Sequence, residues 1–112
     1  MREVIITKEC LDFIDNQEER FINKFFQLVE VMGEVKVVHS NFVKKLQSTH
    51  FYELRIKAGN EYRIVMFAID HLNFSECDKV VCLNGFIKKS TKDYKKVLKQ
   101  AELILNEYLQ QK

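Results

Sequence analysis

Two segments that are typical of β-strands stand only three residues apart, and this short spacing constrains the fold more than any other feature of the chain. Residues 51–57 and 61–69 are both rich in Val, Ile, Tyr and Phe, which are residue types that favour strands. The linker Ala58-Gly59-Asn60 is long enough only to reverse the chain direction. The two segments are therefore predicted to form an antiparallel hairpin.

The rest of the chain alternates between strand-like and helix-like patterns, with apolar residues at helical spacing in its first third and near its end. In chain order, we expect a strand over 2–6, a helix over 8–14 with Thr7 as N-cap, and a helix from Asn16 and Glu19 to a stop at Gly33. A loop over 34–50 precedes the hairpin. After the hairpin we expect a third strand over 79–87 and a closing helix that begins at Ser90 or Thr91 with Asp93 as its capping-box acid. This order predicts an α+β domain with an antiparallel sheet, two N-terminal helices packed on one face, and a C-terminal helix.

Size and composition indicate one compact domain over 1–112. A chain of 112 residues that is 46% apolar can close one core, and a second domain is not expected. The three cysteines are odd in number and lack paired spacing, which favours a reducing cytoplasm over a disulfide framework or a zinc ribbon. The sequence shows neither a signal-peptide pattern nor an apolar run of membrane-spanning length, so we expect a soluble, cytoplasmic protein without membrane contact.

The positions of the charged residues bear more on nucleic-acid binding than the net charge does. A net charge of +2 is too small to indicate nucleic-acid binding by itself. In a hairpin centred on the short linker, Arg55 and Arg63 are cross-strand neighbours, and Glu53 and Glu61 share their face. Two interpretations stay open: these residues and Lys57 form a solvated ion-pair lattice, or the arginines form a phosphate-binding face.

A second group of cations surrounds the expected start of the last helix. Lys88, Lys89 and Lys92 lie where positive charge opposes the helix dipole, an arrangement that an anion such as phosphate would stabilise. Asp93 competes as an internal anion, and a solvated lysine run is the alternative interpretation. Tyr94 follows in the first turn, where it either stacks on a base or exchanges a proton, or lies partly buried in the apolar stripe of the helix.

Metal and cofactor sites are not indicated. His39, His50 and His71 have no sequence-adjacent catalytic partner and are interpreted as surface residues, although histidine is a residue type that can serve as a general base. His71, Cys77 and Cys82 are residue types that bind zinc, but their spacing matches no standard zinc site. The chain also lacks a glycine-rich phosphate loop, a nucleophile elbow and a carboxylate pair on a helix face. We therefore expect no metal and no cofactor.

The segment from Phe51 to Tyr108 contains several ordered motifs of a known family. These motifs are Tyr52-Glu53-Leu54-Arg55-Ile56, Tyr62-Arg63-Ile64-Val65, Leu83-Asn84-Gly85-Phe86-Ile87-Lys88-Lys89-Ser90 and Ala101 in a helix that ends near Tyr108, with Lys44-Lys45-Leu46 ahead of them. In this half of the chain the sequence resembles the HigB-like, phage-derived branch of the RelE/ParE toxin superfamily. It departs from the family at Lys92-Asp93, where Thr-Pro is frequent, and in a longer stretch over 71–78.

The resemblance implies a RelE-like fold and the toxin of a type II toxin–antitoxin system, paired with a helix-turn-helix antitoxin. It further implies ribosome-dependent cleavage of mRNA by attack of a 2′-hydroxyl on the adjacent phosphate, which cations stabilise. Carried over to this sequence, the expected catalytic residues are Arg63, Lys89, Lys88, Tyr94 and Arg55. The expected RNA contacts are Lys44, Lys45, Lys57, Lys92 and His50.

Two other functions stay open at this point. A ParE-like toxin would inhibit DNA gyrase by binding and would need no catalytic residues of its own. A non-catalytic RNA-binding module would keep the basic face without turnover. Replacement of Arg63 and Lys89 by Ala discriminates the nuclease from the ParE-like toxin, because only a nuclease loses its effect through lost chemistry while it still binds its target. Harmless expression without an antitoxin would support the binding module.

Overall fold

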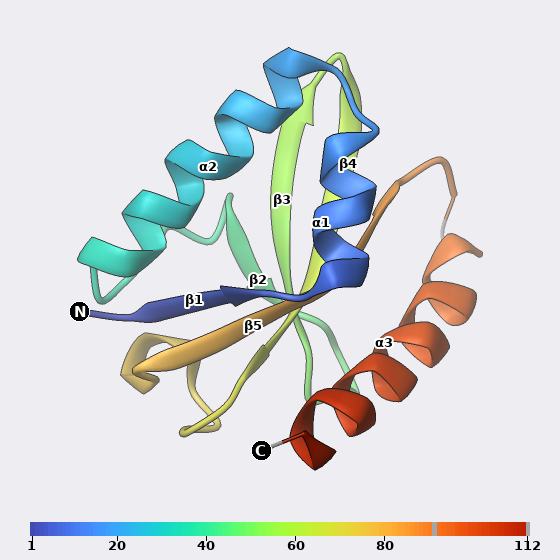
Figure 1. Ribbon diagram of the computed structural model, residues 1–112. Helices are drawn as coiled ribbons and strands as arrows, with labels where there is room; N and C mark the ends of the chain where they lie inside the picture. The colour runs from blue at the N-terminus through green and yellow to red at the C-terminus, as the bar shows by residue number, and fades with distance from the viewer. Residues whose placement is uncertain (91, 112) are drawn as a thin grey trace.

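The computed structural model describes residues 1–90 and 92–111 and shows a five-stranded sheet with helices on both faces (Figure 1). Its elements are β1 (Glu3–Ile6), α1 (Lys8–Asp15), α2 (Glu19–Glu34), β2 (Val43–Lys45), β3 (Tyr52–Ala58), β4 (Asn60–Ala68), a 3-10 turn (Phe74–Glu76), β5 (Lys79–Ile87) and α3 (Asp93–Gln110). The strand order is β1-β5-β4-β3-β2. The predicted α+β class is confirmed.

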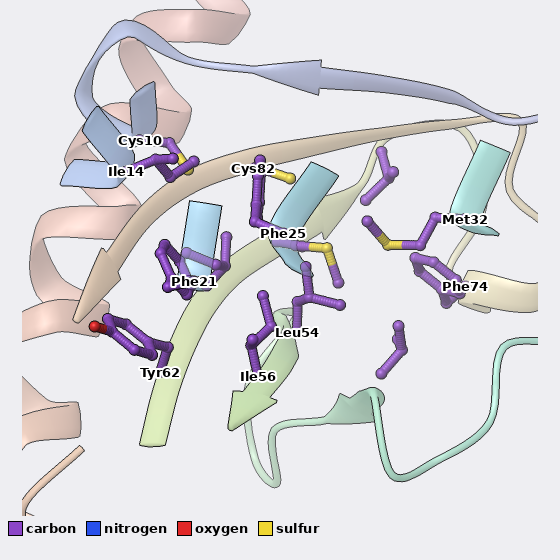
Figure 2. Close-up of a cluster of buried hydrophobic side chains, with 14 of the residues drawn as sticks. Cys10, Ile14, Phe21, Phe25, Met32, Leu54, Ile56, Tyr62, Phe74 and Cys82 are labelled. Carbon is purple, nitrogen blue, oxygen red and sulfur yellow. The ribbon is translucent and has the colours of Figure 1, made fainter. Parts of the chain in front are cut away.

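Each face of the sheet carries its own apolar core. On one face, Phe21 and Phe25 of α2 and Ile14 of α1 pack against side chains of β3 and β4, among them Leu54, Ile56 and Tyr62 (Figure 2). On the other face, Ala101 and Leu105 of α3 belong to a second cluster with Phe51, Val65, Val81, Leu83 and Phe86. In this structure α1 and α2 thus pack on one face of the sheet, and α3 covers part of the other face.

The central hairpin has the predicted register. Arg55 lies directly opposite Arg63, and Ala58 pairs with Asn60 across Gly59. Gly59 has a φ of 81°, a left-handed conformation that glycine adopts without steric cost. Because cross-strand partners share a face, both arginines lie on the side of the sheet that α3 covers.

The sheet differs from the prediction at both edges. Residues 43–45 were expected in a loop, but they form β2, which pairs antiparallel with Tyr52–Leu54. A strand of three residues is too short to show a periodicity, so the sequence pattern could not reveal it. At the other edge, β1 runs parallel to β5, and the expectation of a purely antiparallel sheet is wrong.

Helix boundaries match the prediction only in part. Thr7 caps α1 as expected, because its Oγ1 accepts from Cys10 N at 3.1 Å. The start at Asn16 is wrong, since Asn16 is the C-cap of α1 and α2 begins at Glu19 after Glu18. The glycine stop is also wrong: Gly33 lies inside α2, where its carbonyl accepts from the N–H of Arg2 at 2.9 Å.

The last helix begins later than predicted. Its first residue is Asp93, with Lys92 as N-cap, so a start at Ser90 is wrong, and the alternative start at Thr91 lies outside the described residues. The capping-box acid still binds backbone, because Asp93 Oδ2 accepts from the N–H groups of Lys89 at 2.9 Å and Ser90 at 3.0 Å. These bonds lower the pKa of the Asp93 carboxyl.

Among the described residues, no helix combines the length and apolarity needed to cross a lipid bilayer.

Candidate nucleic-acid interface

Glu53 is the centre of a charged cluster on the face of the sheet that α3 partly covers. Its side chain is almost fully buried, with a residue exposure of 4%. Oε1 accepts a 2.5 Å hydrogen bond from the hydroxyl of Tyr94 and lies 3.6 Å from Nε of Arg63. Oε2 lies 3.5 Å from Nε of Arg55. One carboxylate therefore joins both hairpin arginines and the first turn of α3.

Arg63 is buried beneath this cluster, with an exposure of 3%. Its Nη2 lies 3.2 Å from Oε1 of Glu61, and its Nη1 donates to the carbonyl of Tyr62 at 3.0 Å. Its Nε makes no hydrogen bond, although the Glu53 carboxylate is near. A buried guanidinium depends on such paired carboxylates, because an isolated charge in the interior is very costly. The solvated ion-pair lattice is therefore wrong for Arg63 and Glu53.

Tyr94 covers the cluster from α3. Its ring packs edge-on against Phe86, with centroids 5.0 Å apart, and Nζ of Lys88 lies 6.0 Å from the ring centroid. Burial, followed by the hydrogen bond to Glu53 and the charge of that carboxylate, raises the pKa of Tyr94 to about 12. The phenol is therefore neutral at physiological pH, and its proton is directed to Glu53.

The burial of Arg63 has a signal in the sequence, which the residue pattern of β4 carries. In a strand, residues 63, 65 and 67 share one face, and Val65 and Phe67 belong to the apolar cluster beneath α3. An arginine in line with two apolar residues lies at the border of a covered surface. This pattern indicates a paired, buried arginine rather than an exposed one.

Next to the buried cluster, the same face carries more accessible cations. The side chain of Arg55 is 32% exposed. Lys44 lies opposite Glu53 in the β2–β3 pairing, and Lys57 lies opposite Glu61 in the hairpin, and both lysines are exposed. Because α3 packs on β5 and to a smaller extent on β4, these cations on β2 and β3 lie beside the helix rather than beneath it (Figure 1).

The strand–helix junction adds further cations to this end of the molecule. The N–H of Lys88 donates to the carbonyl of Glu61 at 2.8 Å, which ties the junction to the hairpin. Lys89 and Lys92 are exposed, and the backbone of Lys89 is held by Asp93. The structure thus brings Arg55, Arg63 and Tyr94 together around Glu53. Lys88 joins the strand–helix junction to this group through Glu61 and Tyr94.

Two of the predicted RNA contacts lie apart from this group. Lys45 pairs with Tyr52 across β2 and β3, and its Nζ lies 5.8 Å from the Tyr52 ring on the opposite face of the sheet. His50 Nε2 lies 2.5 Å from Oε1 of Glu102, two turns along α3 from Tyr94, and its ring packs on Phe51.

The cysteines are free and buried in the described structure. Burial raises the pKa of Cys10, and it raises that of Cys82 to about 12, so both thiols stay protonated at neutral pH. No group of three or more potential metal ligands occurs within residues 1–90 and 92–111.

Comparisons with known proteins identify the fold and the family of the chain. The chain is similar in fold to the free-state structure of an arginine-to-alanine double mutant of the Escherichia coli toxin RelE, with a TM-score of 0.63 and 14% identity over 88% of this chain and 96% of the other. No significant match was found among curated proteins. The model of the family described as "Phage derived protein Gp49-like (DUF891)" matches residues 11–106. The predicted RelE-like fold and phage-derived family are thereby confirmed, and the chain belongs to the phage-derived Gp49-like family.

Proposed function

We propose that this protein is the toxin of a two-protein toxin–antitoxin system and that it cleaves mRNA on the ribosome. The observation that carries the proposal is the Tyr94–Glu53 hydrogen bond at the border of an accessible basic surface. That surface combines a group able to move a proton with cations able to hold a phosphate. The family and the fold support the toxin assignment.

In the proposed reaction, the 2′-oxygen of a nucleotide bonds to the adjacent phosphorus while the bond from phosphorus to the 5′-oxygen breaks. Tyr94 accepts the 2′-hydroxyl proton as it transfers its own proton to Glu53. This coupled transfer fits a phenol with a pKa of about 12, because a free tyrosinate is scarce at neutral pH. An ammonium group of Lys88 or Lys89 donates a proton to the leaving 5′-oxygen.

The arginines have different parts in this proposal. Arg55, which is partly exposed, contacts the phosphate and neutralises the charge that develops in the transition state. Arg63 is buried and acts through Glu53, so we assign it a positioning role. Lys44, Lys57 and Lys92 attract the RNA backbone, whereas Lys45 and His50 lie outside this surface and have no part in the proposed reaction.

The test is a reconstituted translation reaction with a defined mRNA, in which the 5′ ends of the products are mapped by primer extension. The wild-type protein is expected to cut the message only when ribosomes are present. Arg55→Ala and Tyr94→Phe should each lower the rate by about a hundredfold to a thousandfold, in the range of single catalytic groups. Lys45→Ala is the control on the opposite face and should cut normally.

Intact transcripts in cells whose growth has stopped would contradict the nuclease. A supercoiling assay with DNA gyrase then identifies a ParE-like inhibitor. If expression without an antitoxin does not affect growth and the protein still binds RNA, the chain is a non-catalytic RNA-binding module.

A further inference from the structure

The strand–helix junction carries two neighbouring lysines, and their surroundings differ. Lys88 still pairs in line with β5, since its N–H donates to the carbonyl of Glu61 at 2.8 Å. Side chains of a strand alternate between its two faces. Phe86 belongs to the apolar cluster beneath α3, and Ile87 packs against the cluster on the other face. Lys88 therefore follows Phe86 onto the face of the charged cluster around Glu53.

The ammonium of Lys88 lies beside Tyr94. Its Nζ is 6.0 Å from the centroid of the Tyr94 ring, within the range of a cation–π interaction. The same ring packs on Phe86. Lys88 is half-buried, whereas Lys89 is exposed. Lys88 thus places a positive charge next to the phenol that accepts the 2′-hydroxyl proton in the proposed reaction.

The carboxylate of Asp93 holds the next part of the junction. Its Oδ2 accepts from the N–H groups of Lys89 at 2.9 Å and Ser90 at 3.0 Å. These two bonds lower the pKa of the Asp93 carboxyl, and the positive charge of Lys89 adds to the effect. Asp93 is also the first residue of α3. One side chain therefore ties the backbone that follows Lys88 to the helix that carries Tyr94, and Lys89 has its charge partner in Asp93.

We propose that Asp93 is a positioning residue that fixes the junction so that the ammonium of Lys88, and not that of Lys89, reaches the leaving 5′-oxygen. This inference rests on the proposed function, since it decides which of the two lysines donates the proton. The Lys88 ammonium loses one proton to the 5′-oxygen as the bond from phosphorus to that oxygen breaks. The resulting amine takes up a proton from water when the product leaves.

Two other roles of Asp93 lead to different expectations. As an internal anion at the start of α3, Asp93 would compete with the RNA phosphate, and its removal would raise the cleavage rate. As a support for Tyr94 it would be redundant, because the hydrogen bond to Glu53 and the packing on Phe86 already fix that ring. The experiment therefore compares Asp93 with Lys88 and with Tyr94.

The first measurement is the cleavage rate of a defined mRNA on purified ribosomes. Lys88→Ala should lower kcat by about a hundredfold and Asp93→Ala by about tenfold, with KM changed by less than about twofold. Because Asp93 acts through Lys88, the double variant should be no slower than Lys88→Ala. Asp93→Asn keeps an oxygen that accepts hydrogen bonds and should retain more than about a third of the wild-type rate. Thermal unfolding checks that each variant is folded.

The second measurement replaces the 5′-oxygen of the scissile linkage by sulfur. A thiolate leaves without a proton, because thiols are far more acidic than alcohols. On this message the defects of Lys88→Ala and Asp93→Ala should shrink to within about threefold of the wild type, whereas Tyr94→Phe should stay slow. Lys89→Ala should lose at most about fivefold on either message. Lys95→Ala, at an exposed position of α3, is the control and should cut at the wild-type rate.

The outcomes separate this inference from the nuclease itself. Additive losses in the double variant, or an Asp93→Ala defect that persists on the sulfur message, would overturn the positioning role and leave the nuclease intact. A faster Asp93→Ala would overturn it in favour of competition with the phosphate. A larger loss in Lys89→Ala than in Lys88→Ala would reverse the assignment of the lysines. If the wild-type protein does not cut the message, the proposed function falls together with this inference.

Discussion

Tyr94 in the first turn of α3 and Glu53 in the middle of the sheet are joined by a 2.5 Å hydrogen bond, although 41 residues separate them in sequence. The same carboxylate faces the buried guanidinium of Arg63. The Glu53 side chain therefore both holds the first turn of α3 on the sheet and neutralises the buried charge of Arg63.

Replacement of Glu53 by Gln should destabilise the fold. The amide keeps the shape of the side chain but leaves Arg63 with Glu61 as its only ion-pair partner within residues 1–90 and 92–111. Removal of one member of a buried ion pair leaves the other charge buried without its partner, so we expect a loss of about 3 kcal/mol in the free energy of unfolding. Urea unfolding measures it.

Glu61→Gln is the matched control for that change. The Glu61 side chain is 57% exposed, although it contacts the same guanidinium. An exposed partner contributes little, so the expected loss is about 0.5 kcal/mol. Equal losses in the two variants would show that Glu53 has no special part in holding Arg63.

Tyr94→Phe should remove the last step of the tyrosine titration. The pKa of Tyr94 is raised from 10.0 to about 12, so the folded protein holds this proton more tightly than the unfolded chain. The associated stability is present below pH 10 and is lost as the pH rises from 10 to about 12. Phenolate absorbance followed against pH should show a late step in the wild type and none in the variant. A late step of equal size in both would assign it to another tyrosine.

Local patterns predicted the hairpin well. The register of Arg55 against Arg63 was predictable because the linker around Gly59 is short. The burial of Arg63 was not predicted, because it depends on Tyr94 and Phe86, which come from distant parts of the chain. The alternation of residues 63, 65 and 67 carried a part of that information.

The edges of the sheet show the limit of such patterns. β2 has three residues and exists only through its pairing with β3, so its own sequence holds no period. The parallel pairing of β1 with β5 joins residues 3–6 to 79–82, a contact that no local signal encodes. The two lysines of β2 were therefore grouped together, although neighbouring strand residues point to opposite faces.

Lys44→Ala and Lys45→Ala should separate those two lysines. Lys44 shares the face of Glu53 and Arg55, whereas Lys45 lies with Tyr52 on the other face. We expect Lys44→Ala to weaken binding of a short single-stranded RNA and to reduce the slope of log affinity against log salt by about 1. Fluorescence anisotropy over a salt series measures both. An equal effect of Lys45→Ala would contradict the assignment of the RNA to one face.

Arg2→Lys should lower the free energy of unfolding, although the substitution keeps the positive charge. Arg2 is buried, with a residue exposure of 7%. Its guanidinium donates to five carbonyls, those of Met32, Val35, Lys36, Phe74 and Cys77. Lysine has three donors at one point and cannot reach all of them. A loss of about 3 kcal/mol is expected from unfolding in urea. Lys8→Arg, at an exposed pair with Asp12, should change nothing measurable.

Gly85→Ala should destabilise the protein by steric overlap. A Cβ at this position in β5 would lie 2.6 Å from Cδ2 of Phe13 and 2.7 Å from Cδ1 of Ile64. The packing of α1 on β5 thus explains this glycine without any catalytic role, and overpacking of this kind costs about 1–3 kcal/mol. Gly33→Ala is the contrasting change, because a Cβ at position 33 would meet only the carbonyl of Arg2, at 3.4 Å. Gly33 lies inside α2, and an alanine in a helix is more favourable than a glycine by up to about 1 kcal/mol. Thermal unfolding should therefore move the two Tm values in opposite directions, and a rise for Gly85→Ala would show that α1 is not packed closely on β5.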